Sequence, residues 1–120
     1  MRGRCLIVVF FSTLAAAATP LAQDQTPTRR DITIVAHERV FEPNRIVVTK
    51  DDLVRITLKS DAQPRSFAID AYRISKRVAS SASITFEFFA NQPGTFTFYC
   101  NLTSVEACGE MKGTLVVSPK

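Results

Sequence analysis

The segments Asn91-Gln-Pro-Gly-Thr-Phe-Thr-Phe-Tyr-Cys100 and Met111-Lys-Gly-Thr-Leu-Val-Val117 say most about the fold. In the first, a Pro-Gly turn leads into alternating threonine and phenylalanine, which indicates a half-buried β-strand. The second is β-branched and apolar and indicates another strand. The loop between these strands holds a second cysteine, Cys108. We therefore expect a β-protein with its sulfur side chains gathered at one loop.

Five upstream segments have the same strand-like character, and turn signals separate them. The expected strands are Ile32–Ala36, Arg45–Thr49, Leu53–Leu58, Ser66–Ile69 and Ala82–Phe89. The turn signals are Glu42-Pro-Asn44, Lys50-Asp-Asp52, Ser60 to Pro64 and Asn91 to Gly94. About seven short strands with no convincing helix predict an all-β sandwich or small barrel.

The N-terminus has the pattern of a secretory signal peptide. A basic start precedes an apolar run, residues 5–18, that is shorter than the roughly 20 residues a membrane-spanning helix needs. We expect cleavage after Ala22 or Ala18, with an uncleaved anchor as the alternative. The predicted divisions are a signal peptide over residues 1–22, a flexible leader over 23–30 and one domain over 31–120. The mature chain is then periplasmic or extracellular, with no membrane span.

Charge and cysteine content exclude several classes of protein. Without Arg2 and Arg4 the net charge falls from +4 to +2, too little for a nucleic-acid binder. Cys5 leaves with the signal, so Cys100 and Cys108 remain. Two cysteines are too few for a disulfide-framework fold, but they suffice for one bridge in an oxidising compartment. We expect a monomer.

Enzyme chemistry finds little support in the residue counts. His37 is the single histidine, so no two-histidine metal site can form within one protomer. No nucleophile elbow or phosphate-binding glycine loop is present. We therefore expect no catalytic residues.

The two C-terminal segments resemble a cupredoxin. In that family a Pro-Gly turn leads into a strand that ends at a copper-binding cysteine, and the next loop supplies a histidine and a methionine. Val40 to Leu58 is similar to the family's opening, a Phe-x-Pro turn before two strands. Pro64 to Ile69 matches the stretch that carries the first copper histidine. The resemblance runs from about Asp31 to Val117 and implies a Greek-key β-sandwich.

The loop spacing is similar to that of the copper domain of cytochrome oxidase subunit two, which carries Cys-x3-Cys-x3-His-x2-Met. On this alignment Cys100 and Met111 match, whereas Ser104 replaces the second cysteine and Cys108 replaces the histidine. Arg65 stands at the upstream histidine. A shorter loop spacing places Val105 at the histidine position instead. Neither alignment supplies a histidine.

The resemblance therefore implies a degenerate copper site. A blue-copper centre needs a thiolate, two imidazoles and a weak axial thioether. Arg65 offers a metal no lone pair because its guanidinium stays protonated, and Ser104 cannot replace a bridging thiolate. What remains is the sulfur set of Cys100, Cys108 and Met111. We expect no cofactor, with copper as the alternative.

Two interpretations of this sulfur set stay open. A Cys100–Cys108 disulfide would close the loop and stabilise the fold by roughly 2–3 kcal/mol in the chain-entropy model. A Cu(I) site would instead use two thiolates and the Met111 thioether. A third outcome is free, idle thiols. A disulfide removes both thiolates, so it excludes the Cu(I) site in the same molecule.

Other notable side chains have structural explanations. His37 is expected at the solvent-facing rim of the first strand. Arg73, Lys76 and Arg77 are expected on a solvated loop, with steering of an acidic partner as the alternative. Alternation assigns most of the C-terminal aromatic residues to the core. These are Phe86, Phe88, Phe89, Phe96, Phe98 and Tyr99.

The sequence thus predicts a secreted, non-enzymatic cupredoxin-like domain that is a structural or protein-interaction module. The alternative is a copper protein, either a Cu(I) carrier or an electron-transfer protein, that uses Cys100, Cys108 and Met111. An unknown protein partner fits the first prediction.

Overall fold

The computed structural model describes Gly3 and residues 27–120. The predicted signal peptide, residues 1–22, and the leader up to residue 26 lie outside the described residues apart from Gly3. Within the part that is described, no helix is long and apolar enough to cross a membrane.

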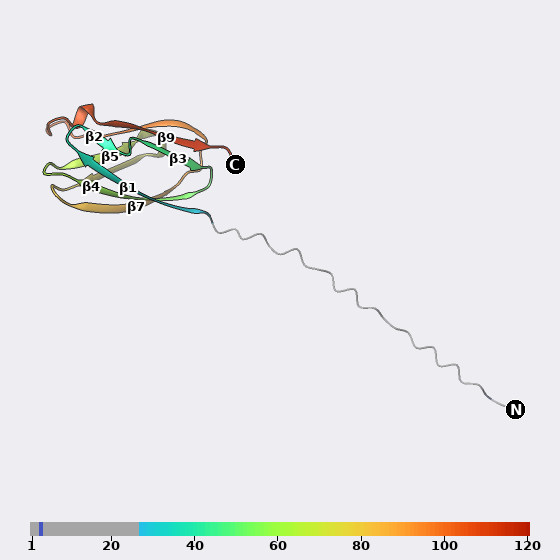
Figure 1. Cartoon of the computed structure of the whole chain (residues 1–120). Coiled ribbons are helices and arrows are strands. Elements are labelled where there is room, and N and C mark those ends of the chain that lie inside the picture. The colour runs from blue at the N-terminus through green and yellow to red at the C-terminus, as the bar shows by residue number, and fades with distance from the viewer. Residues whose placement is uncertain (1–2, 4–26) are drawn as a thin grey trace.

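The described chain forms two β-sheets that face each other (Figure 1). The four-stranded sheet has the order β2-β1-β4-β7 and the five-stranded sheet the order β3-β9-β8-β5-β6. The first contains β1 Arg29–His37, β2 Val40–Glu42, β4 Leu53–Ser60 and β7 Ser83–Phe89. The second contains β3 Arg45–Thr49, β5 Arg65–Ile69, β6 Ile74–Val78, β8 Gly94–Tyr99 and β9 Lys112–Ser118. The all-β sandwich prediction is confirmed.

Parallel pairing occurs once in each sheet, between β1 and β4 and between β3 and β9. The remaining pairs are antiparallel. Two single-turn 3-10 helices, η1 Asp70–Tyr72 and η2 Cys108–Glu110, interrupt the loops. The chain repeatedly crosses from one sheet to the other, so residues far apart in sequence become neighbours at each end of the sandwich.

The structure has two strands that the sequence pattern did not indicate. β2 is only three residues long. In β6 the only apolar side chains are Ile74 and Val78, with Ser75, Lys76 and Arg77 exposed between them, so no alternation appears. The expectation of a solvated loop for Lys76 and Arg77 was therefore wrong. β6 is an edge strand, and charged residues are typical of protected sheet edges.

β1 also begins earlier than expected. Arg29 and Arg30, the last residues of the predicted leader, pair with Leu53 and Val54 of β4. The Arg30 side chain also bonds the buried Asp52 carboxylate at 3.1 Å. Arg29 and Arg30 therefore belong to the strand because of their backbone pairing and the Arg30–Asp52 contact, although the segment has no apolar periodicity.

The core contains a cluster of four phenylalanine rings. Phe67 lies 4.9 Å from Phe98 and 5.5 Å from Phe86 between ring centroids, and Phe41 packs edge-on against Phe98 at 5.4 Å. All four are buried. Fully burying such side chains contributes about 1.5–3 kcal/mol each. The alternating strands thus meet in one apolar layer.

The C-terminal aromatic residues divide into three groups. Phe86 and Phe98 are buried as predicted. Phe88 and Phe96 are partly buried and contact Tyr72, each with ring centroids 5.3 Å apart. Phe89, however, is 54% exposed at the end of β7. Its neighbour Phe88 points inward, so strand alternation turns Phe89 outward.

β9 packs very closely on the core at Gly113. A Cβ atom there would collide with the Phe98 ring and lie 2.7 Å from the carbonyl oxygen of Asn44. Only glycine fits at this position. Gly113 thus allows β9, which begins directly after Met111, to pack against the Phe98 ring.

An inward-facing lysine covers one open side of the sandwich. Lys76 pairs with Phe67 across β5 and β6, so both side chains point to the same face of the sheet. The Lys76 Nζ atom lies 6.0 Å from the centroid of the Phe86 ring. The stem of the lysine therefore shields the edge of the aromatic cluster while the residue stays exposed.

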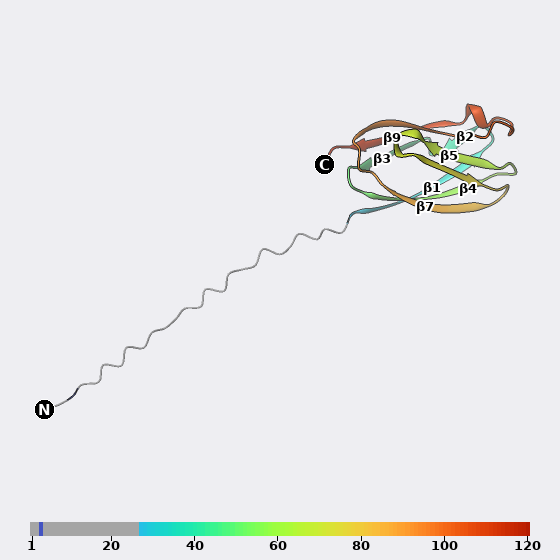
Figure 2. The same cartoon turned by 180° about the vertical axis from the view of Figure 1, so that it is seen from behind.

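The two ends of the sandwich are occupied by different segments. Figures 1 and 2 show η2 and the loop before it at one end, and the start of β1 with the C-terminus at the other. The first end carries the residues that the sequence singled out.

Candidate functional site

The loop end of the sandwich brings the predicted site residues together. Arg65 begins β5, Cys100 directly follows β8, Cys108 lies in η2 and Met111 precedes β9. The Cys100 amide donates to the Met111 carbonyl at 3.1 Å. Ser104 lies on the exposed part of the loop. The antiparallel pairing of β8 with β9 brings the two ends of the loop together.

Cys100 and Cys108 form a disulfide, with their Cα atoms 5.1 Å apart. This is the first of the interpretations that the sequence left open. Cys100 is 3% exposed and Cys108 is 0% exposed. The sulfur atoms accept hydrogen bonds from the backbone amides of Ser66 at 3.3 Å and Leu102 at 3.2 Å. In this state neither sulfur is a thiolate ligand.

Met111 is fully buried beside the disulfide loop. Its amide donates to the Cys108 carbonyl at 3.0 Å and ends η2. Met111 therefore belongs to the core.

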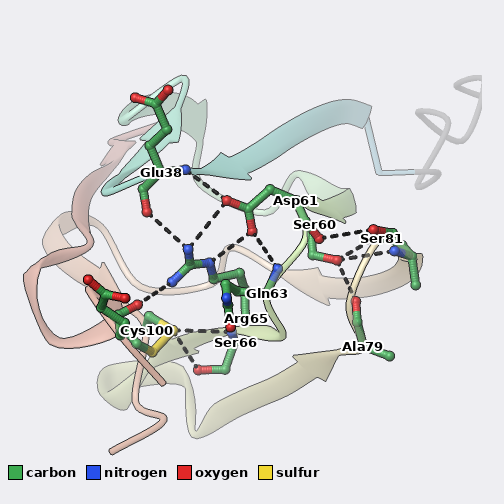
Figure 3. Close-up of polar contacts among 12 residues, drawn as sticks. Glu38, Ser60, Asp61, Gln63, Arg65, Ser66, Ala79, Ser81 and Cys100 are labelled. Atoms are coloured by element: carbon green, nitrogen blue, oxygen red, sulfur yellow. Dashed lines mark hydrogen bonds and ion pairs between the residues drawn. A yellow bond between two sulfur atoms is a disulfide. The ribbon is translucent and has the colours of Figure 1, made fainter. Parts of the chain in front are cut away.

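Arg65 is the most unusual residue of the site, because a charged side chain that is only 3% exposed needs compensating partners. Its guanidinium donates to the Glu106 carbonyl at 2.9 Å and to the Glu38 carbonyl at 3.0 Å. It also makes two hydrogen bonds of 3.3 Å to the two oxygens of the Asp61 carboxylate (Figure 3). Three loops thus meet at one side chain.

Asp61 is the counter-ion of Arg65 and is held by more than this ion pair. Partial burial raises the pKa of Asp61, but the Arg65 hydrogen bonds and the amides of Gln63 and Glu38 outweigh it and bring the pKa below its usual value. The Glu38 amide donates at 2.8 Å and the Gln63 amide at 3.1 Å. Asp61 therefore stays ionised at neutral pH and holds the Arg65 guanidinium in position.

A second, exposed set of ion pairs joins the same loops from outside. Arg39, on the turn between β1 and β2, pairs with Glu110 and lies 3.9 Å from Glu106. Around it is an open hollow of 400 Å³. The hollow is lined by Glu38, Arg39, Val40, Gln63, Arg65, Glu106 and Ala107.

A hydroxyl network supports the disulfide from the side of the five-stranded sheet. The Ser66 hydroxyl donates to the Asn101 side-chain oxygen at 2.6 Å and accepts from the Asn101 amide at 2.8 Å. The Asn101 side-chain nitrogen then donates to Ser75 at 3.0 Å. This network fixes the first residue of the loop against β5 and β6.

The donor set at this end does not fit copper. The disulfide occupies both sulfurs of the pair, and the Arg65 guanidinium has no lone pair to offer a metal ion. Within residues 27–120, no three His, Cys, Asp or Glu side chains form a group that could hold a metal ion. His37 does not join the site, since its Nε2 atom bonds the Glu42 carboxylate at 2.8 Å.

Asp61 and the two carbonyl acceptors were not anticipated from the sequence. For Asp61 a signal existed, because a carboxylate four residues before Arg65 within a predicted turn can reach back to it. The carbonyl oxygens of Glu38 and Glu106 had no signal, because any residue supplies a carbonyl and only the fold brings these two to the guanidinium.

Comparison with known families gives one match that covers nearly the whole chain. The family model of the cupredoxin-like domain matches residues 4–117. No curated protein matches the chain significantly.

Solved structures of copper proteins share the fold. A heme-copper terminal oxidase dimer has a TM-score of 0.69 at 15% identity, over 80% of this chain and 68% of that one. Auracyanin A from Chloroflexus aurantiacus has a TM-score of 0.64 at 17% identity, over 75% and 99%. A copper-containing nitrite reductase from Thermus scotoductus SA-01 has 0.65 at 26% identity, over 78% of this chain but only 28% of its own.

Proposed function

The chain belongs to the cupredoxin-like domain family, and from its altered ligand positions we propose that it is a non-enzymatic, metal-free structural or protein-interaction module. One observation supports this proposal: Arg65, which the sequence resemblance aligns with the first copper histidine, is buried and hydrogen-bonded to two carbonyl oxygens and to Asp61. A fixed positive charge at that place opposes the binding of a cation.

Arg65 and the disulfide together hold the loops at this end in place, as a bound metal ion holds its ligands. A metal ties separate loops to one point. Here the Arg65 guanidinium ties the β1–β2 turn, the β4–β5 turn and the loop after β8, while the disulfide closes that last loop. The loop end therefore keeps a defined shape without a cofactor, which is what a binding surface requires.

The proposal places the domain in an oxidising compartment. A buried disulfide is typical of secreted or periplasmic proteins, and the N-terminal residues 1–22 have the sequence pattern of a signal peptide. We infer that the signal is removed and that the folded domain begins near residue 29, the start of β1.

The copper-binding alternative has one supporting feature. Cys100, Cys108 and Met111 lie at the same end of the sandwich, and reduction of the disulfide would yield two thiolates beside a buried thioether. Such a set suits Cu(I). This alternative requires a reductant that can reach a bond between two buried sulfurs.

The test is to count free thiols and bound copper in mature protein purified from the native host. The proposal predicts no free thiols and no copper, and the same result after incubation with Cu(II). One equivalent of Cu(I) in the reduced protein that is lost in Cys100→Ser would replace the proposal with the copper carrier.

An Arg65→His variant makes the same test sharper. It restores one imidazole, but a second imidazole and the free thiolate are still missing, so no copper–thiolate absorption should appear in visible light. A strongly coloured variant would show that Arg65 alone keeps copper out and that the disulfide opens readily.

A further inference from the structure

The cationic side chains are distributed unequally over the two sheets. Every ion pair found within residues 27–120 lies on the four-stranded sheet or at an end of the sandwich. On the four-stranded sheet, Arg29 and Arg55 both pair with Glu87. On the five-stranded sheet, Arg45, Arg77 and Lys112 have no acidic partner among the described side chains.

The strand register places these three cations on one surface. Arg45 pairs with Thr114 and Lys112 pairs with Tyr99. Arg77 pairs with Ser66 across β5 and β6. The inward positions of these strands are the alternate residues, such as Leu115 and Phe67, which are buried. Arg45, Arg77 and Lys112 are exposed and therefore point away from the core.

The surface between them is open and carries several hydroxyl groups, among them those of Thr97 and Thr114. We call it the cationic face and define it by Arg45, Val47, Arg77, Thr97, Lys112 and Thr114. Val47 is 57% exposed on β3, at the edge of the sheet. Two shallow hollows of 590 and 400 Å³ lie on the face and share Thr97 and Lys112. The two hollows therefore meet at Lys112.

One acidic residue borders the cationic face. Asp70, in η1, lines one of the hollows and accepts a hydrogen bond from the Tyr99 hydroxyl at 2.7 Å. It forms no ion pair with the three cations. The excess positive charge of the face is thus left for a partner.

We propose that the cationic face docks an acidic surface of another protein. The proposal rests on the interaction function proposed above and names the face and the chemistry of the partner. Arg45 and Arg77 are separated by four strand spacings, about 19 Å, which is the scale of a standard protein interface. Threonine hydroxyls between the cations supply hydrogen bonds to carboxylates, and Val47 supplies apolar contact.

A protein fits this face better than a lipid surface does. Recruitment to anionic lipids typically uses four to eight clustered basic residues, often with a protruding apolar side chain. Here three cations are spread across the sheet, and the aromatic side chain of this side, Tyr99, is held by its hydrogen bond to Asp70. Spread cations match carboxylates on a folded partner, whose positions are fixed.

The test uses a photoreactive benzoyl-phenylalanine at Thr97, on the cationic face, in cells of the native host. The matched control has the same group at Thr33, which is exposed on the outer side of β1 in the other sheet. A third position, Ser104, reports on the loop end. We expect one cross-linked protein from Thr97 and none from Thr33, with the cross-linked peptide carrying a net negative charge.

Charge-reversal variants separate specific docking at the cationic face from non-specific attraction by the net charge of the protein. Arg45→Glu/Lys112→Glu should lower the yield of the Thr97 cross-link at least tenfold. The control variant, Lys50→Glu/Lys59→Glu, changes the net charge by the same amount. Its two lysines lie outside the cationic face and form no ion pair with described residues. This control should leave the yield of the Thr97 cross-link within twofold. Circular dichroism of both purified doubles checks that each is folded.

The remaining outcomes overturn the proposal in distinguishable ways. A cross-link from Ser104 but not Thr97 would leave an interaction module whose docking face is the loop end. Binding to phosphatidylglycerol vesicles that Arg45→Glu/Lys112→Glu abolishes, without a protein cross-link, would make the face a lipid contact. The absence of a cross-link from all three positions would remove both this proposal and the interaction function. Copper in the purified protein would contradict the metal-free state proposed above, and the Thr97 cross-link would then decide separately whether the cationic face docks a protein.

Discussion

The aromatic core and the Arg65 cluster lie next to each other on β5, yet they hold the fold by different means. Phe67 contacts three other rings through apolar surface alone. Arg65, two residues earlier on the same side of the strand, is equally buried but depends on acceptors from three loops. Apolar contact tolerates many substitutions of similar volume, whereas a buried charge tolerates almost none.

The same difference bears on how freely the sequence can vary in the core and at the loop end. The core asks only for apolar side chains of suitable size, so it persists at the low identities found among the structural matches. The loop end requires particular partners at particular atoms. At Arg65 the required partner is Asp61, whose carboxylate pairs with the guanidinium.

The largest expected effect is in the core. Phe67→Ala removes the ring that contacts Phe41, Phe86 and Phe98, and we expect a loss of about 3–5 kcal/mol in the free energy of unfolding. Urea denaturation at low and high salt should give the same loss, because no charge is involved. Phe89→Ala, at a 54% exposed ring, is the control and should cost less than about 0.5 kcal/mol.

Arg65→Met should come next, with a loss of about 3 kcal/mol. The variant nearly keeps the volume of the side chain but leaves Asp61 without its counter-ion and the Glu38 and Glu106 carbonyls without their arginine donor. Arg65→Met/Asp61→Asn should recover part of the loss, which a double-mutant cycle measures. Arg39→Met, which breaks the 60% exposed ion pair of the same end, should cost no more than about 1 kcal/mol. Equal losses for the two arginines would contradict the role given to burial.

Removal of the disulfide should cost about 2–3 kcal/mol in Cys100→Ala/Cys108→Ala. Wild-type protein unfolded in a reductant should show a similar loss, whereas the double variant should be unaffected by the reductant. Because both sulfurs are buried, folded wild type should also keep its disulfide in mild reductant. Rapid reduction of the folded protein, followed by thiol labelling, would show that the loop opens.

The smallest effect is a pH dependence that belongs to the loop end alone. The folded pKa of Asp61 is lowered below the usual value of 3.8 for an aspartate, so its ionised form stabilises the fold above that pH. The contribution is lost as the pH falls from about 3.8 through the lower folded value. Wild type should therefore lose more stability than Asp61→Asn in this range, as measured by urea titration at each pH. Parallel curves would assign the acid sensitivity to other carboxylates.

Most of the fold could be predicted from the sequence because alternation reports burial directly. β7 and β9 alternate clearly and were expected. β6 was missed because an edge strand does not have to alternate when most of its side chains meet water. The start of β1 was missed for the same reason, since Arg29 and Arg30 are exposed.

The candidate site was predictable only in part. The Cys100–Cys108 disulfide was one of the expected outcomes, because the loop must return to the sheet and two cysteines frame it. That Arg65 lacks a lone pair for metal follows from its chemistry. Its partners at Glu38 and Glu106 could not be predicted, because carbonyl acceptors depend on how three distant loops meet.

Lys76 bears on how copies of this domain behave when they are crowded. It faces inward from the edge strand β6, beside the Phe86 ring. A strand from another molecule could pair with β6 only by trapping this ammonium group away from water. The lysine therefore disfavours edge-to-edge pairing between molecules at β6, which is the step that extends sheets into fibrils.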